Sequence, residues 1–436
     1  MNPPLPSEGE GLGVRVPADW CRCDGTGGLD ERAVWSRRAV MAAGVSWLAS
    51  RSALAQATFA QDKQDRNVVV VVFLRGGADG LHLVTPYFED AYYRGRPALA
   101  TRAPSDRRGG PRCVDLDGRF GLHPTLAPLL PAWADGELGI VHAVGSGDST
   151  HSHFEAMATM ERGLTNQSDL ASGGWLARHL ESQAGTSVPL RAVAWGYTMP
   201  ESLSGAASAT LVETLSDFRL RAPRGDVRER LAHLYQTGGD QLSEAGAQTL
   251  GVLQTLEKLD PKEYKPENGA DYPKTPTGQA MKEVAFLVRQ RVGLEVACLD
   301  SGGWDSHVNQ AYLDQQMGDL AKTLAALRQD LGREMSRVTV VVQSEFGRRV
   351  EENSGLGTDH GAGGVFFAMG GGVAGGKVYG DWPGIGPDQR TGPGDLRITT
   401  DYRTVLAEIL EKRLGSGAVP DVFPALDSKR LGLFRA

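Results

Sequence analysis

The stretch VVVVVFLRGGADG, residues 68–80, is the part of the sequence that best predicts the fold. Its unbroken apolar run, 68–74, has the length of one strand and is typical of a strand buried on both faces of a sheet. The glycine-rich turn that follows places a carboxylate, Asp79, directly after the strand. We therefore expect a central strand with a polar residue beyond its carboxyl end.

Further apolar runs along the chain predict the other strands of this sheet. They cover residues 138–144, 190–195, 294–299, 338–342 and 365–369. Helical patterns cover residues 154–162, 227–235, 241–259, 278–291, 310–331 and 402–413. Strands that alternate with helices predict an α/β fold with a mainly parallel sheet flanked by helices. One α/β domain is expected over 56–436, with the charged helical segment 213–290 as a cap or insert within it.

The bulk composition excludes two classes of partner. The 436 residues are 41% hydrophobic and 23% charged, with a formal net charge of -7, which is ordinary for a soluble globular protein. A mildly acidic chain lacks the basic footprint of a nucleic-acid-binding protein. No apolar run reaches the roughly 18 residues of a membrane span. We expect no nucleic-acid partner and no integral membrane span.

The N-terminal region has the order of a signal peptide. Arg37 and Arg38 precede a short apolar stretch, 42–48, and small residues follow at Ala53 and Ala55. The paired arginines are typical of the twin-arginine type. Residues 1–55 are therefore predicted to be a twin-arginine signal region with a disordered N-terminal extension. It would direct the chain through the twin-arginine translocase to the periplasm or the medium. The alternative is a surface helix with two adjacent arginines.

Polar side chains follow four of the predicted strands and precede the last one. They are Asp79, Ser152 and His153, Asp305 and His307, Glu345 and Arg348, and Asp359 and His360. In open α/β sheets, ligands bind beyond the carboxyl ends of the strands. Oxygen and imidazole ligands suit zinc, manganese or magnesium. The sequence thus predicts one site that holds one or two divalent ions.

Several of these residues also have a simpler interpretation. Asp79 is compatible with a turn-stabilising carboxylate. Ser152 at a helix start is compatible with an N-cap, with Glu155 completing a capping box. His82 and His123 lie next to apolar residues and are typical of core histidines. The joint pattern, and no single member, favours the metal site.

Seven motifs resemble a known family. They are FLRGGADG (73–80), RFGLHP (119–124), SHFEA (152–156), GGWDSH (302–307), SEFGR (344–348), GTDHG (357–361) and TTDYR (399–403). Over nearly all of the mature chain they are similar to domain of unknown function 1501, within the alkaline phosphatase superfamily.

The resemblance implies an alkaline-phosphatase-like fold and a small anionic ester as substrate. It implies Ser152 as the nucleophile, and His153 and Arg348 as groups that bind substrate or stabilise anionic oxygens. The metal ligands that it implies are Asp79, Asp305, His307, Glu345 and His360, with Asp359 as a further ligand. Phe346 departs from the superfamily, which usually has histidine at this point.

Three functions follow from these observations. The first is an exported metal-dependent hydrolase that acts on phosphate or related esters through a serine nucleophile. The second is a catalytically inactive, exported binding protein that retains the fold, which Phe346 favours. The third is a serine hydrolase that uses Ser152, His360 and Asp359. The absence of a G-x-S-x-G elbow at Ser152 counts against the third function.

Overall fold

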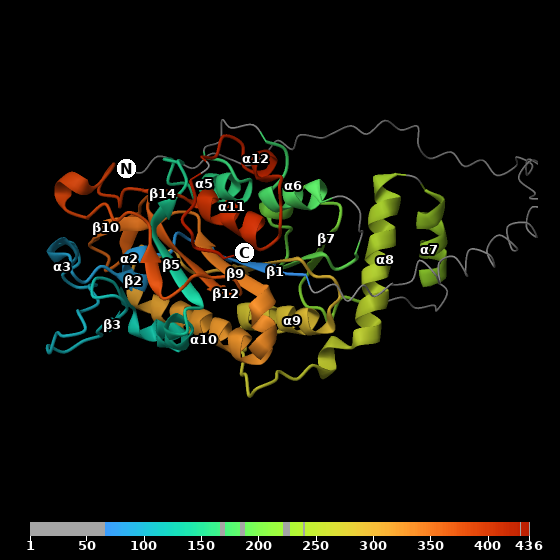
Figure 1. Cartoon of the computed structure of the whole chain (residues 1–436), viewed down its shortest axis with the longest axis horizontal. Helices are drawn as coiled ribbons and strands as arrows, with labels where there is room; N and C mark the ends of the chain where they lie inside the picture. Colours follow the sequence, from blue (N-terminus) through green and yellow to red (C-terminus); the bar gives the residue numbers. More distant parts are fainter. Residues whose placement is uncertain are drawn as a thin grey trace, which may run out of the picture. The chain divides into compact units, whose positions relative to one another are not determined.

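A nine-stranded sheet forms the centre of the molecule (Figure 1). The structure is a computed structural model that describes residues 66–165, 171–183, 188–220, 227–238, 240–427 and 429–435. The strand order is β13 (Lys377–Tyr379), β5 (Leu138–Gly145), β12 (Gly364–Gly370), β9 (Val338–Ser344), β1 (Val68–Leu74), β8 (Val296–Ser301), β6 (Ala192–Trp195) and β7 (Ala209–Val212), with β14 (Thr400–Asp401) also paired to β5. The predicted signal region, 1–55, lies outside the described residues.

The sheet is parallel apart from one strand. β12 runs antiparallel to both of its neighbours, β5 and β9, and every other pairing in the sheet is parallel. The fold class is therefore confirmed as α/β with a mainly parallel sheet. The six predicted strands correspond to β1, β5, β6, β8, β9 and β12, with ends that differ by at most two residues.

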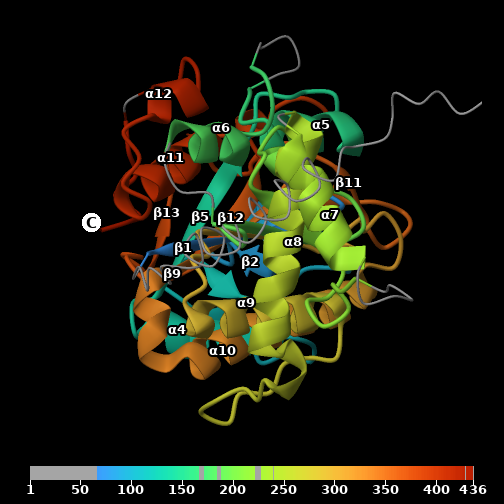
Figure 2. The same cartoon turned by 90° about the vertical axis from the view of Figure 1, so that its right-hand side faces the viewer.

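Alternate residues of β1 enter two different cores, because successive side chains of a strand point to opposite faces. The even-numbered residues share a core with α9 (Pro276–Gln290) and α10 (Leu313–Leu331). The odd-numbered residues share a core with α6 (Trp175–Ser182) and α11 (Tyr402–Lys412). Figure 2 shows these helix pairs on opposite sides of the sheet. Burial on both faces explains why the run of valines in β1 shows no polar alternation.

The remaining elements are shorter or lie at the margins. The helices are α2 (Gly80–Leu83), α3 (Asp90–Gly95), α4 (Leu130–Ala134), α5 (His153–Glu161), α7 (Val227–Thr237), α8 (Gln241–Leu259) and α12 (Val419–Val422). Two small sheets are β2 (Val84–Thr85) with β4 (Gly121–Leu122) and β3 (Val114–Asp115), and β10 (Arg348–Glu352) with β11 (Thr358–His360). The sequence analysis predicted neither these short strands nor α6.

The segment 213–290 divides between two environments. α7 and α8 lie beside each other beyond the β7 end of the sheet, joined by an ion pair between Arg228 and Glu257 (Figures 1 and 2). α9 packs in the core under the sheet, to which α8 also contributes Val252 and Leu256. The cap or insert over 213–290 remains a prediction.

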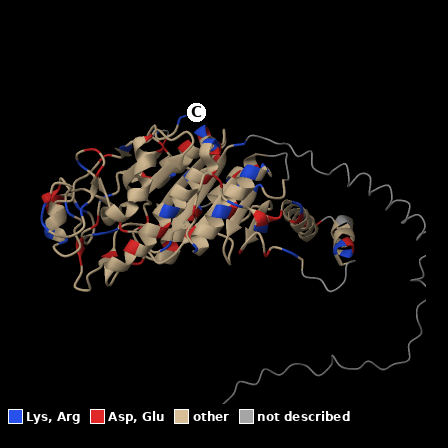
Figure 3. Cartoon of the chain, turned by 90° about the horizontal axis from the view of Figure 1, so that it is seen from below, with Lys and Arg blue, Asp and Glu red and all other residues tan. Residues whose placement is uncertain are grey.

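Figure 3 shows acidic and basic segments interspersed along the described ribbon. Among the residues that the structure describes, no helix combines the length and apolar character that a membrane span requires.

Candidate metal centre

A tight turn at the end of β1 brings two later loops together. Gly76 and Gly77 both have positive φ, +124° and +61°. A Cβ on Gly76 would lie 2.5 Å from the backbone nitrogen of Asp305, and one on Gly77 would lie 2.4 Å from the ring of Phe346. Glycine is therefore required here for close approach as well as for conformation.

Three imidazoles converge on one carboxylate beyond the strand ends; we call His153, Asp305, His307 and His360 the imidazole cluster. The Nε2 atoms of His153 and His360 each lie 3.5 Å from an oxygen of Asp305, and Nε2 of His307 lies 3.2 Å away. The Nε2 atoms of His307 and His360 are 2.8 Å apart. Two facing nitrogens at this distance need a proton or a cation between them, since their lone pairs repel.

The opposite ring nitrogen of each imidazole faces a hydrogen-bond acceptor. Nδ1 of His153 lies 2.7 Å from Glu345, and Nδ1 of His307 lies 3.3 Å from Asp359. Nδ1 of His360 lies 2.8 Å from the backbone carbonyl of His151. Carboxylates and carbonyls accept, so each Nδ1 is placed to donate a proton to its partner. In a neutral ring that is protonated at Nδ1, Nε2 carries the lone pair, which is the usual state of metal-binding histidine.

Electrostatics distinguish two of the rings. The hydrogen bond to Glu345 raises the pKa of His153 above its ordinary value, although burial opposes this. Burial lowers the pKa of His360. Nε2 of His153 is buried and has no hydrogen-bond partner among the described residues. A buried polar atom without a partner calls for an explanation, and a missing ion is one.

Arg348 holds the framework of the site together and does not reach toward a substrate. Its guanidinium is buried and donates to the carbonyls of Gly76, Gly77 and Thr358 and, at 2.5 Å, to Asp305. Burial would raise the pKa of Asp305, but this hydrogen bond and the charge of Arg348 keep it below its usual range. The expected contact of Arg348 with anionic substrate oxygens is corrected, because these donors are already engaged.

Glu345 stands behind His153 and does not face the centre of the cluster. One of its oxygens accepts from Nδ1 of His153 and from the backbone N–H of Gly76, and the other accepts from the hydroxyl of Ser344. The side chain is fully buried. Glu345, predicted as a direct ligand, thus lies against Nδ1 of His153, while Nε2 of His153, a residue predicted at the substrate, points toward Asp305.

Asp79 lies outside the imidazole cluster. One oxygen accepts from Arg96 at 2.6 Å and from Gln310 at 2.8 Å, and the other accepts from the backbone N–H of His82. Burial would raise the pKa of Asp79, but the charge and hydrogen bonds of Arg96 hold it below its ordinary value. Asp79, predicted as a ligand, is thus the anionic half of a buried ion pair with Arg96.

Ser152 and Asp359 sit beside the cluster. Ser152 is the N-cap residue of α5, but its hydroxyl caps no backbone N–H, so the capping box with Glu155 is not formed. Asp359 contacts His307 and Asn353 and does not contact His360. A triad of Ser152, His360 and Asp359 is thus not assembled, because Nδ1 of His360 is held by the carbonyl of His151.

Phe346 fills the place where the superfamily resemblance implies histidine. Its ring packs 4.9 Å from the ring of His153 and 4.8 Å from that of His360, measured between centroids. This apolar wall supports the imidazoles but offers no ligand atom.

Two residues of the site escaped the sequence reading. His151 has the left-handed φ of +53°, which aims its carbonyl at His360, and its ring Nε2 lies 2.9 Å from the buried Asp395. His151 was visible in the motif, but a role carried by its backbone has no signature in the sequence. Asp395 follows a Pro-Gly pair and shows no signal at all.

A second group of possible ligands comprises His82, His123 and Asp314. The two imidazoles are buried and stack with their centroids 4.5 Å apart. Nδ1 of His123 accepts the backbone N–H of Thr125, so its proton lies on Nε2, which points toward Asp314 at 3.9 Å. Burial, followed by repulsion from His123, lowers the pKa of His82 to about 3. His123 therefore has no free lone pair, in contrast to the imidazole cluster.

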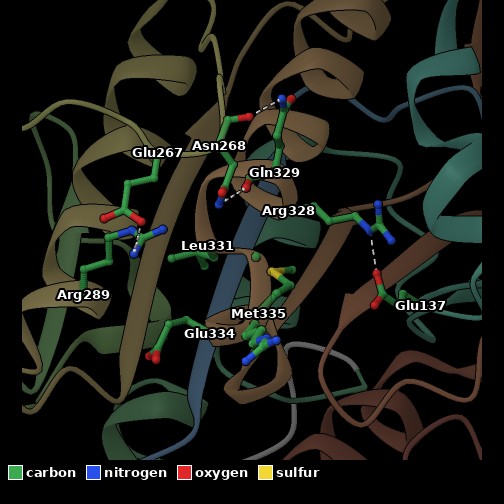
Figure 4. Close-up of a pocket in the computed structure, with 11 residues that line it drawn as sticks. Glu137, Glu267, Asn268, Arg289, Arg328, Gln329, Leu331, Glu334 and Met335 are labelled. Carbon is green, nitrogen blue, oxygen red and sulfur yellow. Dashed lines mark hydrogen bonds and ion pairs between the residues drawn. The ribbon is translucent and has the colours of Figure 1, made fainter.

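A cavity of about 600 Å³ lies at the opposite end of α10 (Figure 4). Its charged walls pair with one another: Arg328 contacts Glu137, and Arg289 contacts Glu267. Gln329 and Asn268 also bond to each other. Most of these polar groups are thus paired with one another, although Nε of Arg289 has no hydrogen-bond partner among the described residues.

Comparison with known proteins gives two kinds of match. No curated protein matches the chain. Two solved structures of TAB5 alkaline phosphatase mutants, both with Mg bound in the M3 site, align over 70% of this chain and 91% of theirs. Their sequence identities are 11% and 12%, and their TM-scores are 0.29 and 0.28.

The family comparison is more extensive. The model of a family described as a protein of unknown function (DUF1501) matches residues 66–408. This range covers well over half of the chain and includes every member of the imidazole cluster. The chain belongs to the DUF1501 family.

Proposed function

We propose that this protein is an exported, metal-dependent hydrolase that cleaves a phosphate or related ester through Ser152. One observation carries the proposal: three imidazoles point their Nε2 atoms at Asp305, and the residue before His153 is a serine at a helix start. A cation would bind these nitrogens together, and the cluster uses the residue types that bind zinc and related ions.

The residues present fit one divalent ion. His153, His307, His360 and Asp305 would hold it, while Glu345 and Asp359 fix the orientation of two of the rings. Two further carboxylates of the predicted ligand set are already saturated by other partners, and Phe346 occupies one wall. This leaves no second complete set at the same place among the described residues. When bound, the ion would supply Lewis-acid stabilisation of charge on the ester oxygens.

Ser152 is the nucleophile in this proposal. It stands between His151 and His153, and its hydroxyl is not used to cap α5. The free N–H groups at the start of this nine-residue helix favour negative charge close to the serine. The Oγ–phosphorus bond forms as the bond to the leaving alcohol breaks, with the serine proton passing to solvent. Water then cleaves the serine ester and restores the hydroxyl.

Ser152→Ala tests the nucleophile. The mature chain, loaded with zinc, manganese or magnesium, is assayed with phosphate monoesters and diesters, and its metal content is measured in parallel. We expect the variant to lose turnover and keep its metal. Ser149→Ala removes an exposed hydroxyl from the same loop and should leave both unchanged. Full activity of the Ser152 variant would end the assignment.

Export belongs to the same proposal. The order of Arg37 and Arg38, an apolar stretch and small residues supports twin-arginine translocation, cleavage after Ala55 and a periplasmic or secreted mature chain of 56–436. Changing both arginines to lysine should retain the chain in the cytoplasm, whereas Arg51→Lys should not. Export that is unaffected by the double change would remove this part of the proposal.

A second candidate is a binding protein without turnover, which Phe346 favours because it replaces a potential ligand with an apolar ring. The same assay separates the two candidates. Metal bound stoichiometrically, with no hydrolysis across the ester panel, supports the binding protein. Hydrolysis that requires Ser152 supports the enzyme.

A further inference from the structure

Three large apolar side chains are exposed on segments that carry or contact members of the imidazole cluster. Phe154 is 88% exposed, Val308 65% and Leu356 53%. Phe154 directly follows His153, and Val308 directly follows His307. Exposed apolar side chains that gather beside a site are a feature of ligand and partner surfaces. We call these three residues the apolar rim.

The backbone ties the members of the rim to the cluster. Asn353 donates to the carbonyl of His307, and the loop that it begins carries Leu356. The carbonyl of Leu356 then accepts from the backbone of Gln310, two residues after Val308. Phe154 lies in the first turn of α5, whose preceding residue, His153, lies 3.5 Å from Asp305. The rim therefore lies on loops and a helix start whose neighbouring residues build the cluster.

Fixed charges around the cluster limit how much anionic charge a substrate can carry. Four carboxylates, those of Asp305, Glu345, Asp359 and Asp395, belong to the cluster or to the groups that hold it. The cations in contact with these carboxylates, among the described residues, are Arg348 and Arg349. One divalent ion would bring this set to neutrality, with the imidazoles uncharged.

The cationic side chains at the cluster already face carboxylates. Arg348 donates to backbone carbonyls and to Asp305. Arg349 lies 3.5 Å from Asp359 and 3.9 Å from Asp395, and its Nε has no hydrogen-bond partner among the described residues. A phosphate monoester, with about two negative charges at neutral pH, would meet little compensating charge beyond the ion itself. A diester carries one negative charge and can place a second organic group on the apolar rim.

We propose that the substrate is a phosphodiester with an aromatic or aliphatic group that packs on Phe154, Val308 and Leu356. This inference rests on the proposed hydrolase function and names the substrate class of the same site. Specificity then comes from charge at the cluster and from apolar contact at the rim. The proposal narrows the substrate expected from the sequence, a small anionic ester, to an ester with one negative charge and an apolar substituent.

Three ester probes test the proposal on the metal-loaded mature chain. They are bis(p-nitrophenyl) phosphate, methyl p-nitrophenyl phosphate and p-nitrophenyl phosphate, which share one leaving group. We expect kcat/KM to fall in that order, with the first at least about tenfold above the monoester, because the aryl group gains contact and the monoester carries extra charge.

A double variant, Phe154→Ser with Val308→Ser, tests the rim separately. It should raise KM for bis(p-nitrophenyl) phosphate roughly five- to tenfold and change KM for the methyl diester by less than about twofold. Leu234→Ser with Leu242→Ser is the matched control, since these exposed leucines lie on α7 and α8, and it should change neither value.

The outcomes separate this inference from the proposed function. Hydrolysis that prefers the monoester overturns the diester assignment and leaves the hydrolase standing. Preference for diesters with equal loss on both probes, or no loss, in the rim variant overturns the apolar contact. Hydrolysis of none of the three probes by metal-loaded protein counts against the proposed function itself, and the substrate assignment falls with it.

Discussion

The molecule contains two groups of histidines beside a carboxylate, and they differ in the polarity of their hydrogen bonds. In the imidazole cluster each Nδ1 faces an acceptor, so a neutral ring protonated at Nδ1 has its lone pair on Nε2, toward the centre. In the group of His82, His123 and Asp314, Nδ1 of His123 faces the N–H of Thr125, so Nε2 carries the proton. The same residue types therefore have opposite hydrogen-bond arrangements in the two groups.

This difference shows that the ability of a histidine to bind a metal ion depends on the hydrogen-bond partner of its other ring nitrogen. A metal-binding histidine donates its other ring proton to an oxygen, and this outer contact is part of the site. Spacing in the sequence reveals residue types but not the partner on the far side of the ring. The experiments below test whether hydrogen-bond polarity separates the two groups.

The largest effect is expected when a ring of the imidazole cluster is removed. His360→Ala should weaken zinc binding by roughly 100-fold or more, beyond the loss typical of an outer-contact change. Competition with a chromophoric chelator measures the affinity. His233→Ala, an exposed histidine on α7, is the control and should bind zinc as the unchanged chain does. Equal affinity of both variants would contradict the assignment of His360 as a metal ligand.

The next effect concerns an outer contact alone. Glu345→Gln keeps the shape of the side chain but removes the charge that accepts the proton of His153. Zinc affinity should fall about 10- to 100-fold, because the ring becomes less basic and less firmly oriented. Glu351→Gln, at an exposed position in β10, serves as the matched control. An unchanged affinity would show that the charge of the group that accepts from Nδ1 of His153 does not affect zinc binding.

The buried pair of His82 and His123 should affect how the free energy of unfolding depends on pH. The folded chain resists protonation of His82 until about pH 3, whereas the unfolded chain binds that proton near pH 6.5. Lowering the pH from 6.5 therefore favours the unfolded state and costs about 2 kcal/mol by pH 5. Urea unfolding of the metal-free chain at pH 7, 6 and 5 should show this loss.

His82→Asn supplies the control for that measurement. His142, whose pKa burial lowers to about 4, titrates in both chains and cancels in the comparison. The variant should therefore lose about 2 kcal/mol less between pH 6.5 and pH 5 than the unchanged chain. Parallel curves for the two chains would contradict the buried, neutral state of His82.

The smallest effect is expected at His123. His123→Ala deprives the N–H of Thr125 of its cap, so the free energy of unfolding should fall by about 1 kcal/mol. Zinc stoichiometry and affinity should stay within twofold of the unchanged chain. Loss of a bound ion in this variant would mean that the group of His82, His123 and Asp314 also holds a metal ion. The direction of the hydrogen bonds to Nδ1 would then not separate the two histidine groups.

Much of the fold was predictable because its strands are buried on both faces. The continuous apolar runs of β1 and β9 cannot sit on a surface, and the helices between the strands show regular periodicity. Short elements such as β13 and β14 were not predictable, since two or three residues leave no pattern.

The site was only partly predictable, for reasons visible in its residues. Asp305, His307 and His360 lie close together as expected, because the loops after parallel strands meet at one edge. Asp79 has the position of a ligand, but its partner Arg96 lies in no motif, so the ion pair was hidden. Glu345 and His153 contact each other, and the sequence does not show which of the two faces the centre of the cluster.

The antiparallel strand β12 has a consequence for the order in which the chain can assemble. β5 forms its hydrogen-bonded ladders with β12, β13 and β14, all of which come after residue 363. During synthesis, more than two hundred residues are therefore added after β5 before any of these partners leaves the ribosome. α5, which begins with His153, follows β5 and gains its fixed place only then. The four groups of the cluster therefore come together only after residue 360 has been made, so the metal ion proposed above would bind at a late stage of synthesis.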